Sequence, residues 1–513
     1  MIRHILTVST GTLASRMLGF LRDAMIAALL GTGVVADAFL LAFQFINVAR
    51  RMLAEGALNS ALVPGYLRAR ETEGRVAAAA FAGRVLGTTT VILVLIALFL
   101  GLLMPLMITV LAPGFVGQPT LQLAVNDARL MLPYFAFVGP VTVMMGVLNA
   151  EHRFILSAFS PLLFNIVLIV VLFALLIWRY DAVVASYVIA ATVGIAGCLQ
   201  MLILIQRRPH REGLASPIRV AFDPQMAAFL RKAIPGMTAN SGPQFLIVAG
   251  AIIASSSPAA VSWLYFANRL IELPLGMVGV AMGTVLVPAL TRALHDSDQP
   301  SLTRTESRGL ELAVGLVLPA TLGLIVLAEM TIRVLFEHGA FTAADTAATA
   351  IALETLALGL PAHVLVKVLS PAFFARDNTM TPLIATLCGL AVAILAGLLL
   401  GPRFGANGVA ASIALAAWCN AIILAWRGGR TFGFSIDAQA RKRLPRIVLA
   451  ALLMAGMLWY AEYFVASAVL NAGLGAQVTI LGGLVAAAIA FYGLLLDLFG
   501  IVSWGEAISD LRG

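Results

Sequence analysis

Charged residues are scarce in this sequence. Only 11% of the 513 residues are charged, and 61% are hydrophobic, whereas soluble domains carry about 25% charged residues. This composition excludes a soluble globular protein, and a chain so apolar does not stay solvated as a disordered coil. Cysteine is also rare: the three cysteines all lie in apolar stretches, which excludes a disulfide framework and a cysteine-based metal motif.

The sequence also lacks the motifs of an enzyme. The six histidines form no pair with the spacing of metal ligands or catalytic residues, and no phosphate-binding loop of the G-x-x-x-x-G-K-[ST] type occurs. Nor does it contain the paired-aspartate magnesium motif of a membrane glycosyl- or phosphotransferase. We therefore expect a transporter without catalytic residues or cofactor, while a metal site stays open.

What the sequence has instead is a series of long apolar segments. A membrane-spanning helix needs about 20 apolar residues, and the first connection is short and marked by Gly31-Thr32-Gly33. Segments of spanning length lie at about 5–30, 34–62, 77–111, 121–149, 158–178, 183–206, 226–254, 260–290, 309–336, 346–374, 380–400, 406–426, 445–467 and 474–499. The sequence thus predicts an all-α polytopic membrane protein with about fourteen transmembrane helices.

Arginine and lysine are distributed unevenly between the predicted loops. Counted in alternate loops, eighteen lie on one side and two or three on the other. Short loops rich in basic residues face the cytoplasm, so we predict a multi-pass protein of the cytoplasmic (inner) membrane with both termini cytoplasmic. The net charge of +8 then reflects membrane topology, and nucleic acid is not an expected partner.

An internal repeat at an offset near 225 residues divides the chain. Ala61-Leu62-Val63-Pro64 is echoed by Val285-Leu286-Val287-Pro288, and Pro133 by Pro361. Because each repeat holds six spans, an even number, both enter the membrane from the same side, which is the parallel plan of some transporters. The predicted domains are an N-lobe (1–215, helices 1–6), a C-lobe (216–430, helices 7–12) and a C-terminal helix pair (431–513, helices 13–14).

Charged residues at membrane depth cost about 2.5–3.5 kcal/mol each on insertion scales and often mark a functional site. In the first, second and eighth segments they cluster with helical spacing; Asp37, Gln44 and Arg51 recur every seven residues and so share a face. The tenth segment adds Lys367. The clustered residues are Arg16, Arg22, Asp23, Asp37, Arg50, Arg51, Glu55, Arg269 and Glu272. We predict that these residues line a cavity between the two lobes.

Two interpretations of these charges stay open. Arginine–carboxylate pairs can be buried ion pairs that only fix helix packing, and residues near the membrane interface can extend to water. Guanidinium groups also bind planar anions such as phosphate or pyrophosphate through two hydrogen bonds. In the three segments the arginines exceed the acidic residues by five to four, which favours an anionic cargo.

A series of short motifs runs along residues 1 to about 430. They are Ser15–Asp23, Ala36–Phe39, Arg50–Ala57, Ala112–Phe115, Leu148–Ala150, Ser262–Tyr265 before Arg269, Val366–Leu369 with Pro371, and Thr381-Pro382. In combination these motifs resemble those of the MurJ (MviN) family of lipid II flippases. Asn268 departs from the family pattern, which often has an acidic residue before the arginine, and Gln44 and Ile46 replace a more usual lysine and proline.

This resemblance implies transport of lipid II, the undecaprenyl-pyrophosphate-linked disaccharide-pentapeptide, from the inner to the outer leaflet by alternating access, for peptidoglycan and cell wall synthesis. Helices 13 and 14 would flank a groove for the lipid tail. The residues implied to bind the headgroup are Arg16, Arg22, Asp23, Arg50, Arg51 and Arg269, supported by Asp37, Glu55, Glu272 and Lys367. Other expected partners are membrane lipids and cell-wall synthesis proteins, and coupling to the membrane potential or to a monovalent cation stays open.

Three other functions also stay open. A flippase for another polyprenyl-linked oligosaccharide would share the cationic cavity, so only the cargo separates it from a lipid II flippase. A multidrug exporter for cations would favour an apolar or acidic cavity, which the arginines oppose. A membrane scaffold that recruits wall-synthesis enzymes would tolerate loss of the buried arginines but would need its cytoplasmic loops.

Overall fold

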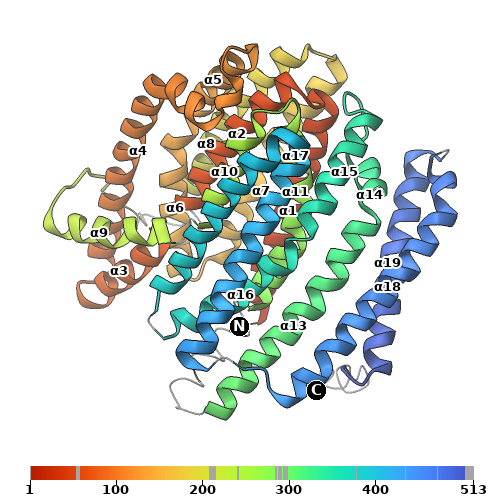
Figure 1. The fold of residues 1–513 in the computed structure, drawn as a ribbon. Coiled ribbons are helices and arrows are strands. Elements are labelled where there is room, and N and C mark those ends of the chain that lie inside the picture. The colour runs from red at the N-terminus through yellow and green to blue at the C-terminus, as the bar shows by residue number, and fades with distance from the viewer. Residues whose placement is uncertain are drawn as a thin grey trace. The chain divides into compact units, whose positions relative to one another are not determined.

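The structure is a computed structural model that describes residues 2–53, 58–206, 215, 217–239, 242–282, 286, 292, 299–376, 378–433, 435–470 and 472–502. Every regular element in these ranges is a helix (Figure 1). This confirms the all-α fold predicted from the apolar segments.

The backbone groups into two compact units. The first unit comprises Met1–Ser262 and His338–Phe341. Its helices are α1 (Ile2–Leu30), α2 (Val34–Met52), α3 (Leu58–Thr72), α4 (Arg75–Leu111), η2 (Pro113–Phe115), α5 (Pro119–Met131), α6 (Tyr134–Ala150), α7 (Phe154–Trp178), α8 (Ala182–Gln206), α9 (Pro224–Ala239) and α10 (Gly242–Ala254).

The second unit comprises Trp263–Glu337 and Thr342–Gly513. It contains most of α11 (Ala260–Ala281), and its other helices are α13 (Gln299–Val326), α14 (Ala328–Phe336), α15 (Ala343–Ala357), α16 (Leu360–Phe374), α17 (Met380–Phe432), α18 (Ala438–Leu470) and α19 (Leu474–Leu498). The predicted division at 215 and 430 stays a prediction.

In the described residues, eight helices are long and apolar enough to cross a membrane, and a ninth span arises if α5 and α6, bent by 43° at their junction, count as one. The protein is therefore an integral multi-pass membrane protein. One of the eight, α17, runs over both of the segments predicted at 380–400 and 406–426, and its backbone leaves helical geometry at Gly405 (φ 56°, ψ −133°). The count of fourteen spans stays a prediction.

Packing within the first unit places α1 against α7, and α2 against α5. The first half of α2 suits this position because Ala36, Ala38 and Ala42 are small and fully buried, so a neighbouring helix can approach closely. Phe39 and Phe43 fill the remaining space and stack with ring centroids 5.7 Å apart. Because every residue from Ala36 to Phe43 is buried, the first half of α2 is enclosed on all sides, including the side that carries Asp37.

The C-terminal helices α18 and α19 pack against each other, and α18 also packs against α13. Their apolar contact includes Leu327, Met454, Leu458 and Tyr492. The Tyr492 hydroxyl donates a hydrogen bond to the backbone carbonyl of Gly315 on α13 (2.8 Å). The predicted helix pair is therefore joined to the second unit by both apolar packing and a hydrogen bond.

Candidate functional site

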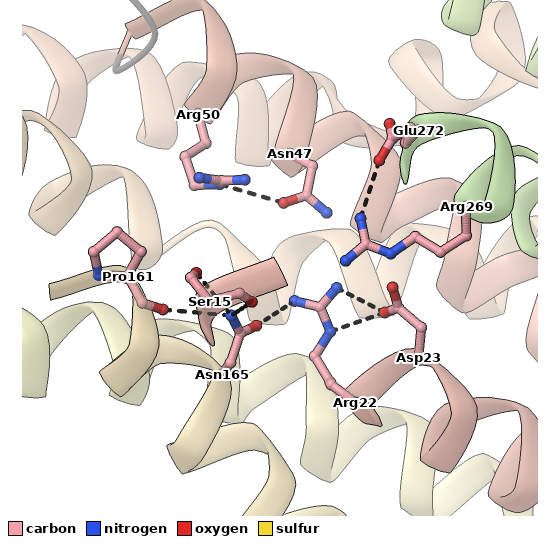
Figure 2. A network of polar contacts seen from close by, with 9 residues as sticks. All are labelled: Ser15, Arg22, Asp23, Asn47, Arg50, Pro161, Asn165, Arg269 and Glu272. Atoms are coloured by element: carbon pink, nitrogen blue, oxygen red, sulfur yellow. Dashed lines mark hydrogen bonds and ion pairs between the residues drawn. The ribbon is translucent and has the colours of Figure 1, made fainter. Parts of the chain in front are cut away.

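Arg22 and Asp23 lie next to each other on α1 and are buried, with 7% and 0% of their surface exposed. The Arg22 guanidinium donates from Nε and Nη2 to Asp23 Oδ1, at 2.9 and 2.6 Å (Figure 2). A buried arginine is strongly destabilising unless its charge is paired. The adjacent carboxylate supplies that pairing, which explains why two charges can stand side by side in an apolar helix.

A third contact ties Arg22 to another helix. Its Nη1 donates to Asn165 Oδ1 on α7 (2.9 Å), and Asn165 Nδ2 donates back to the Ser15 carbonyl of α1 (3.1 Å) (Figure 2). The guanidinium carbon also lies 4.9 Å from the centre of the Phe43 ring on α2, a cation–π distance. Arg22 is thus held by side chains of α1, α2 and α7.

Sequence reasoning did not identify Asn165 or Asn47. Asn165 is a single amide in the otherwise apolar stretch of α7, and polar groups inside membrane helices usually hydrogen-bond to a neighbouring helix. That rule marks Asn165 as a residue of interest, although it does not name the partner.

The arginines of α2 are less buried than Arg22. Arg50 and Arg51 are half-buried, and Arg50 Nε donates to Asn47 Oδ1 over 3.4 Å, one turn earlier on the helix (Figure 2). Arg16 of α1 is exposed within the described residues. These three side chains are more exposed than that of Arg22, which joins α1 to α7.

Asp37 has a partner that the sequence pattern did not show. Its carboxylate accepts hydrogen bonds from the backbone N–H of Ser262 (2.8 Å) and from the Ser262 hydroxyl. Ser262 lies in the first turn of α11, where backbone N–H groups are unpaired and the helix dipole favours a negative charge. Asp37 therefore caps α11, which fits a supporting role.

In the second unit, Arg269 Nη1 and Glu272 Oε2 form an ion pair on α11 (3.0 Å), with 20% and 24% of the side chains exposed (Figure 2). The predicted helical pairing of these two residues is thus present. Lys367 on α16 donates from Nζ to the Leu275 carbonyl of α11 (3.4 Å), so it also supports α11.

The predicted site residues fall into two groups. Arg22, Asp23 and Asp37 are buried, while the remaining arginines are exposed or half-buried. Glu55 lies outside the described residues. Across the described ranges, no group of three or more His, Cys, Asp or Glu side chains is arranged to hold a metal ion. The exposed or half-buried residues are Arg16, Arg50, Arg51 and Arg269, whose guanidinium chemistry suits phosphate-like anions, together with Glu272 and Lys367.

Comparison with known proteins points to one family. The model of the family described as "Lipid II flippase MurJ" matches residues 26–474. A probable lipid II flippase MurJ of Rhizobium meliloti (strain 1021) is 36% identical over 100% of this chain and 96% of the relative. A second such protein, from Rhizobium tropici, is 34% identical over 100% of this chain and 97% of the relative.

Solved structures share the fold. A lipid II flippase MurJ in an inward closed conformation aligns with a TM-score of 0.78 at 23% identity, covering 96% of this chain and 98% of that one. An inward-facing MATE multidrug transporter of the MOP superfamily aligns with a TM-score of 0.64 at 17% identity, covering 84% of this chain and 95% of that one. Because the family model spans most of the chain and both bacterial relatives are matched almost end to end, the chain belongs to the MurJ lipid II flippase family.

Proposed function

We propose that this protein moves lipid II from the cytoplasmic leaflet to the outer leaflet of the inner membrane. The observation that carries this proposal is the end-to-end similarity to relatives named as lipid II flippases. The chemistry of the arginines on α1, α2 and α11 supports it, because lipid II carries a pyrophosphate. The strong excess of basic residues in one set of loops supports cytoplasmic termini.

The headgroup is bound by the accessible guanidinium groups of Arg16, Arg50, Arg51 and Arg269. Pyrophosphate loses its hydration on entering the protein, and charge-assisted hydrogen bonds from arginine replace that water. Alternating access of the two units then exposes the headgroup to the other side. No bond is made or broken, so the protein needs no catalytic group.

Arg22 and Asp23 act as positioning residues. Their hydrogen bonds to each other and to Asn165 join α1 to α7, and a rigid α1 fixes the position of Arg16 six residues earlier. Loss of Arg22 should therefore impair transport through helix positions, whereas loss of Arg16 should remove a contact to the headgroup.

The polyprenyl tail stays in the lipid beside α18 and α19. A chain of this kind is apolar and gains nothing from a cationic site. The surface of α18 is rich in exposed large apolar side chains, among them Leu452, Trp459, Tyr460, Tyr463 and Phe464. Such a surface suits contact with an isoprenoid chain as well as with membrane lipid.

The test is depletion and rescue in a bacterium whose own lipid II flippase can be shut off. Wild type should restore lipid II on the outer leaflet, and Arg269→Ala should lower that exposure by roughly tenfold, equivalent to about 1.4 kcal/mol. Arg333→Ala is the matched control, because Arg333 forms ion pairs with Glu329 and Glu337 in the same unit but is not a predicted site residue.

Each outcome is informative when membrane abundance is equal. Rescue by Arg333→Ala but not by Arg269→Ala supports headgroup binding by Arg269. Full rescue by Arg269→Ala would remove this residue from the site. Correct insertion of the wild type without any rescue would reject lipid II as the cargo and favour another polyprenyl-linked oligosaccharide.

A further inference from the structure

The first unit contains a buried carboxylate that the proposed transport cycle does not use. Asp127 lies on α5, the first half of the bent α5–α6 pair, and none of its surface is exposed. Neither Oδ1 nor Oδ2 has a hydrogen-bond partner among the described residues. An aspartate in this situation differs from Asp23 and Asp37, which are equally buried but well paired.

The helices around α5 supply little compensation. Ser186 of α8 lies beside Asp127, yet its hydroxyl donates to the Val183 carbonyl of its own helix (2.9 Å). The elements packed against α5 are α2, α4, α8 and η2. The charged and titratable described residues of α2, α4, α8 and α5 itself are Asp37, Arg50, Arg51, Arg75, Arg84, Arg129, Tyr187 and Cys198, and none of them hydrogen-bonds to the Asp127 carboxylate.

Several of these charges are engaged elsewhere. Arg84 binds Asp223 and Gln225 near the start of α9, and Arg129 donates to the Gly101 carbonyl of α4 (3.0 Å). An ionised carboxylate buried without a cationic partner is strongly unfavourable, and such a group becomes neutral instead. A neutral carboxylic acid can also donate one hydrogen bond, which an ionised one cannot.

We propose that Asp127 is a proton-binding site, and that the binding and release of this proton is coupled to lipid II transport. The coupling rests on the proposed function, whereas the proton site does not. A metal cation fits less well, because hard cations take several oxygen ligands at once, and among the described residues no group of three or more His, Cys, Asp or Glu side chains could hold a metal ion.

A polar layer at the same α5–α8 contact offers a route for the proton. Exposed Gln122 donates to Asn126 (3.0 Å), and Asn126 donates to the Tyr187 hydroxyl (3.1 Å). Asn126 and Tyr187 are the chain neighbours of Asp127 and Ser186. The half-buried pair of Asn126 and Tyr187 therefore lies next to the fully buried pair of Asp127 and Ser186.

The position of Asp127 also suits a link to conformation. It lies four residues before the end of α5, close to the 43° bend between α5 and α6. Loss of the proton would place a charge in an apolar setting on one arm of this bend, which favours a structure that admits water or a donor to the carboxylate. The bent span is thus placed to respond to protonation.

Infrared difference spectroscopy of the purified full chain at neutral pH tests the proton site. When the spectrum of Asp127→Asn is subtracted from that of wild type, the difference should show the C=O stretching band of one protonated carboxyl group. Asp127→Glu should shift that band and retain it, so the test does not depend on a single variant. The control is Asp181→Asn at the start of α8, where an exposed carboxylate accepts from the Val183 N–H (3.0 Å), and its difference spectrum should lack the band.

Two results would overturn the proton assignment. One is an identical carboxyl band in wild type and Asp127→Asn. The other is loss of the wild-type band when sodium chloride replaces choline chloride at constant ionic strength, because the site would then bind a metal cation.

Coupling is tested in vesicles that contain the purified protein and lipid II. The ratio of lipid II movement with and without a pH gradient should exceed one for wild type and for Asp181→Asn, and equal one for Asp127→Asn. A ratio above one in Asp127→Asn would overturn the coupling. Wild-type protein that moves no lipid II under any gradient would reject the proposed function, while the infrared result would still decide on the proton site.

Discussion

Arg22 shows how a charge can be built into an apolar helix. It donates three hydrogen bonds to Asp23 and Asn165 and lies against the Phe43 ring. The sequence predicted Arg22 and Asp23 as site residues from their intramembrane position. It could not predict Asn165, because a partner 143 residues away leaves no trace in local spacing.

Asn165→Ala should lower transport while the protein still inserts. The variant leaves a buried guanidinium N–H without its acceptor, which costs about 1–3 kcal/mol, and it loosens α1 from α7. Thermal unfolding in detergent and outer-leaflet lipid II exposure are the two measurements.

Gln200→Ala is the matched control, because it removes a buried but neutral hydrogen bond to Ser160 in the same unit (2.9 Å). It should lower stability with little effect on transport. Equal transport by Asn165→Ala and wild type would contradict a positioning role for Arg22.

A further prediction for a single residue concerns Asp37 and the start of α11. Asp37→Ala leaves the Ser262 backbone N–H at the start of α11 without its acceptor, and we expect a loss of about 1–3 kcal/mol in the free energy of unfolding. Asp37→Asn keeps an acceptor and should lose less. A melting temperature that is the same for wild type and both variants would show that this cap contributes nothing to stability.

Among the elements, the turn between α1 and α2 is tightly constrained. The sequence placed a short connection at Gly31-Thr32-Gly33, and the structure has α1 ending at Leu30 and α2 beginning at Val34. Both glycines have positive φ, 63° at Gly31 and 101° at Gly33. A Cβ at Gly31 would lie 2.6 Å from the Ala340 carbonyl oxygen, whereas a Cβ at Gly33 would meet nothing within 4 Å.

These glycines form a matched pair for mutation. Gly33→Ala should cost about 1–3 kcal/mol, because its φ of 101° and ψ of −153° lie in a region that is accessible essentially only to glycine. Gly31→Ala should cost more, because it adds a steric clash with the segment His338–Phe341 of the same unit. The melting temperatures of the two variants give the comparison, and a smaller loss for Gly31→Ala would contradict the close approach.

At the scale of the whole molecule, the sequence predicted the helical, multi-pass architecture well because apolar length is encoded locally. It predicted two separate spans at 380–400 and 406–426, and the structure has a kink between them at Gly405, where the backbone leaves helical geometry. The bend between α5 and α6 falls at Pro133 and so has a cause that is visible in the local sequence, whereas the contact of Asp37 with Ser262 depends on packing between segments 225 residues apart. Periodicity shows which face of a helix is polar, but not which helix that face meets.

The family relationship and the arginine chemistry meet in one central claim: this chain alone moves lipid II across a bilayer, and Arg269 binds its headgroup. The direct measurement is transbilayer movement of lipid II in vesicles that contain only the purified protein, with wild type, Arg269→Ala and Arg333→Ala at equal abundance. The account predicts movement by wild type and Arg333→Ala and a loss of roughly tenfold in Arg269→Ala. Equal movement by all three, or none by a correctly inserted wild type, would contradict it.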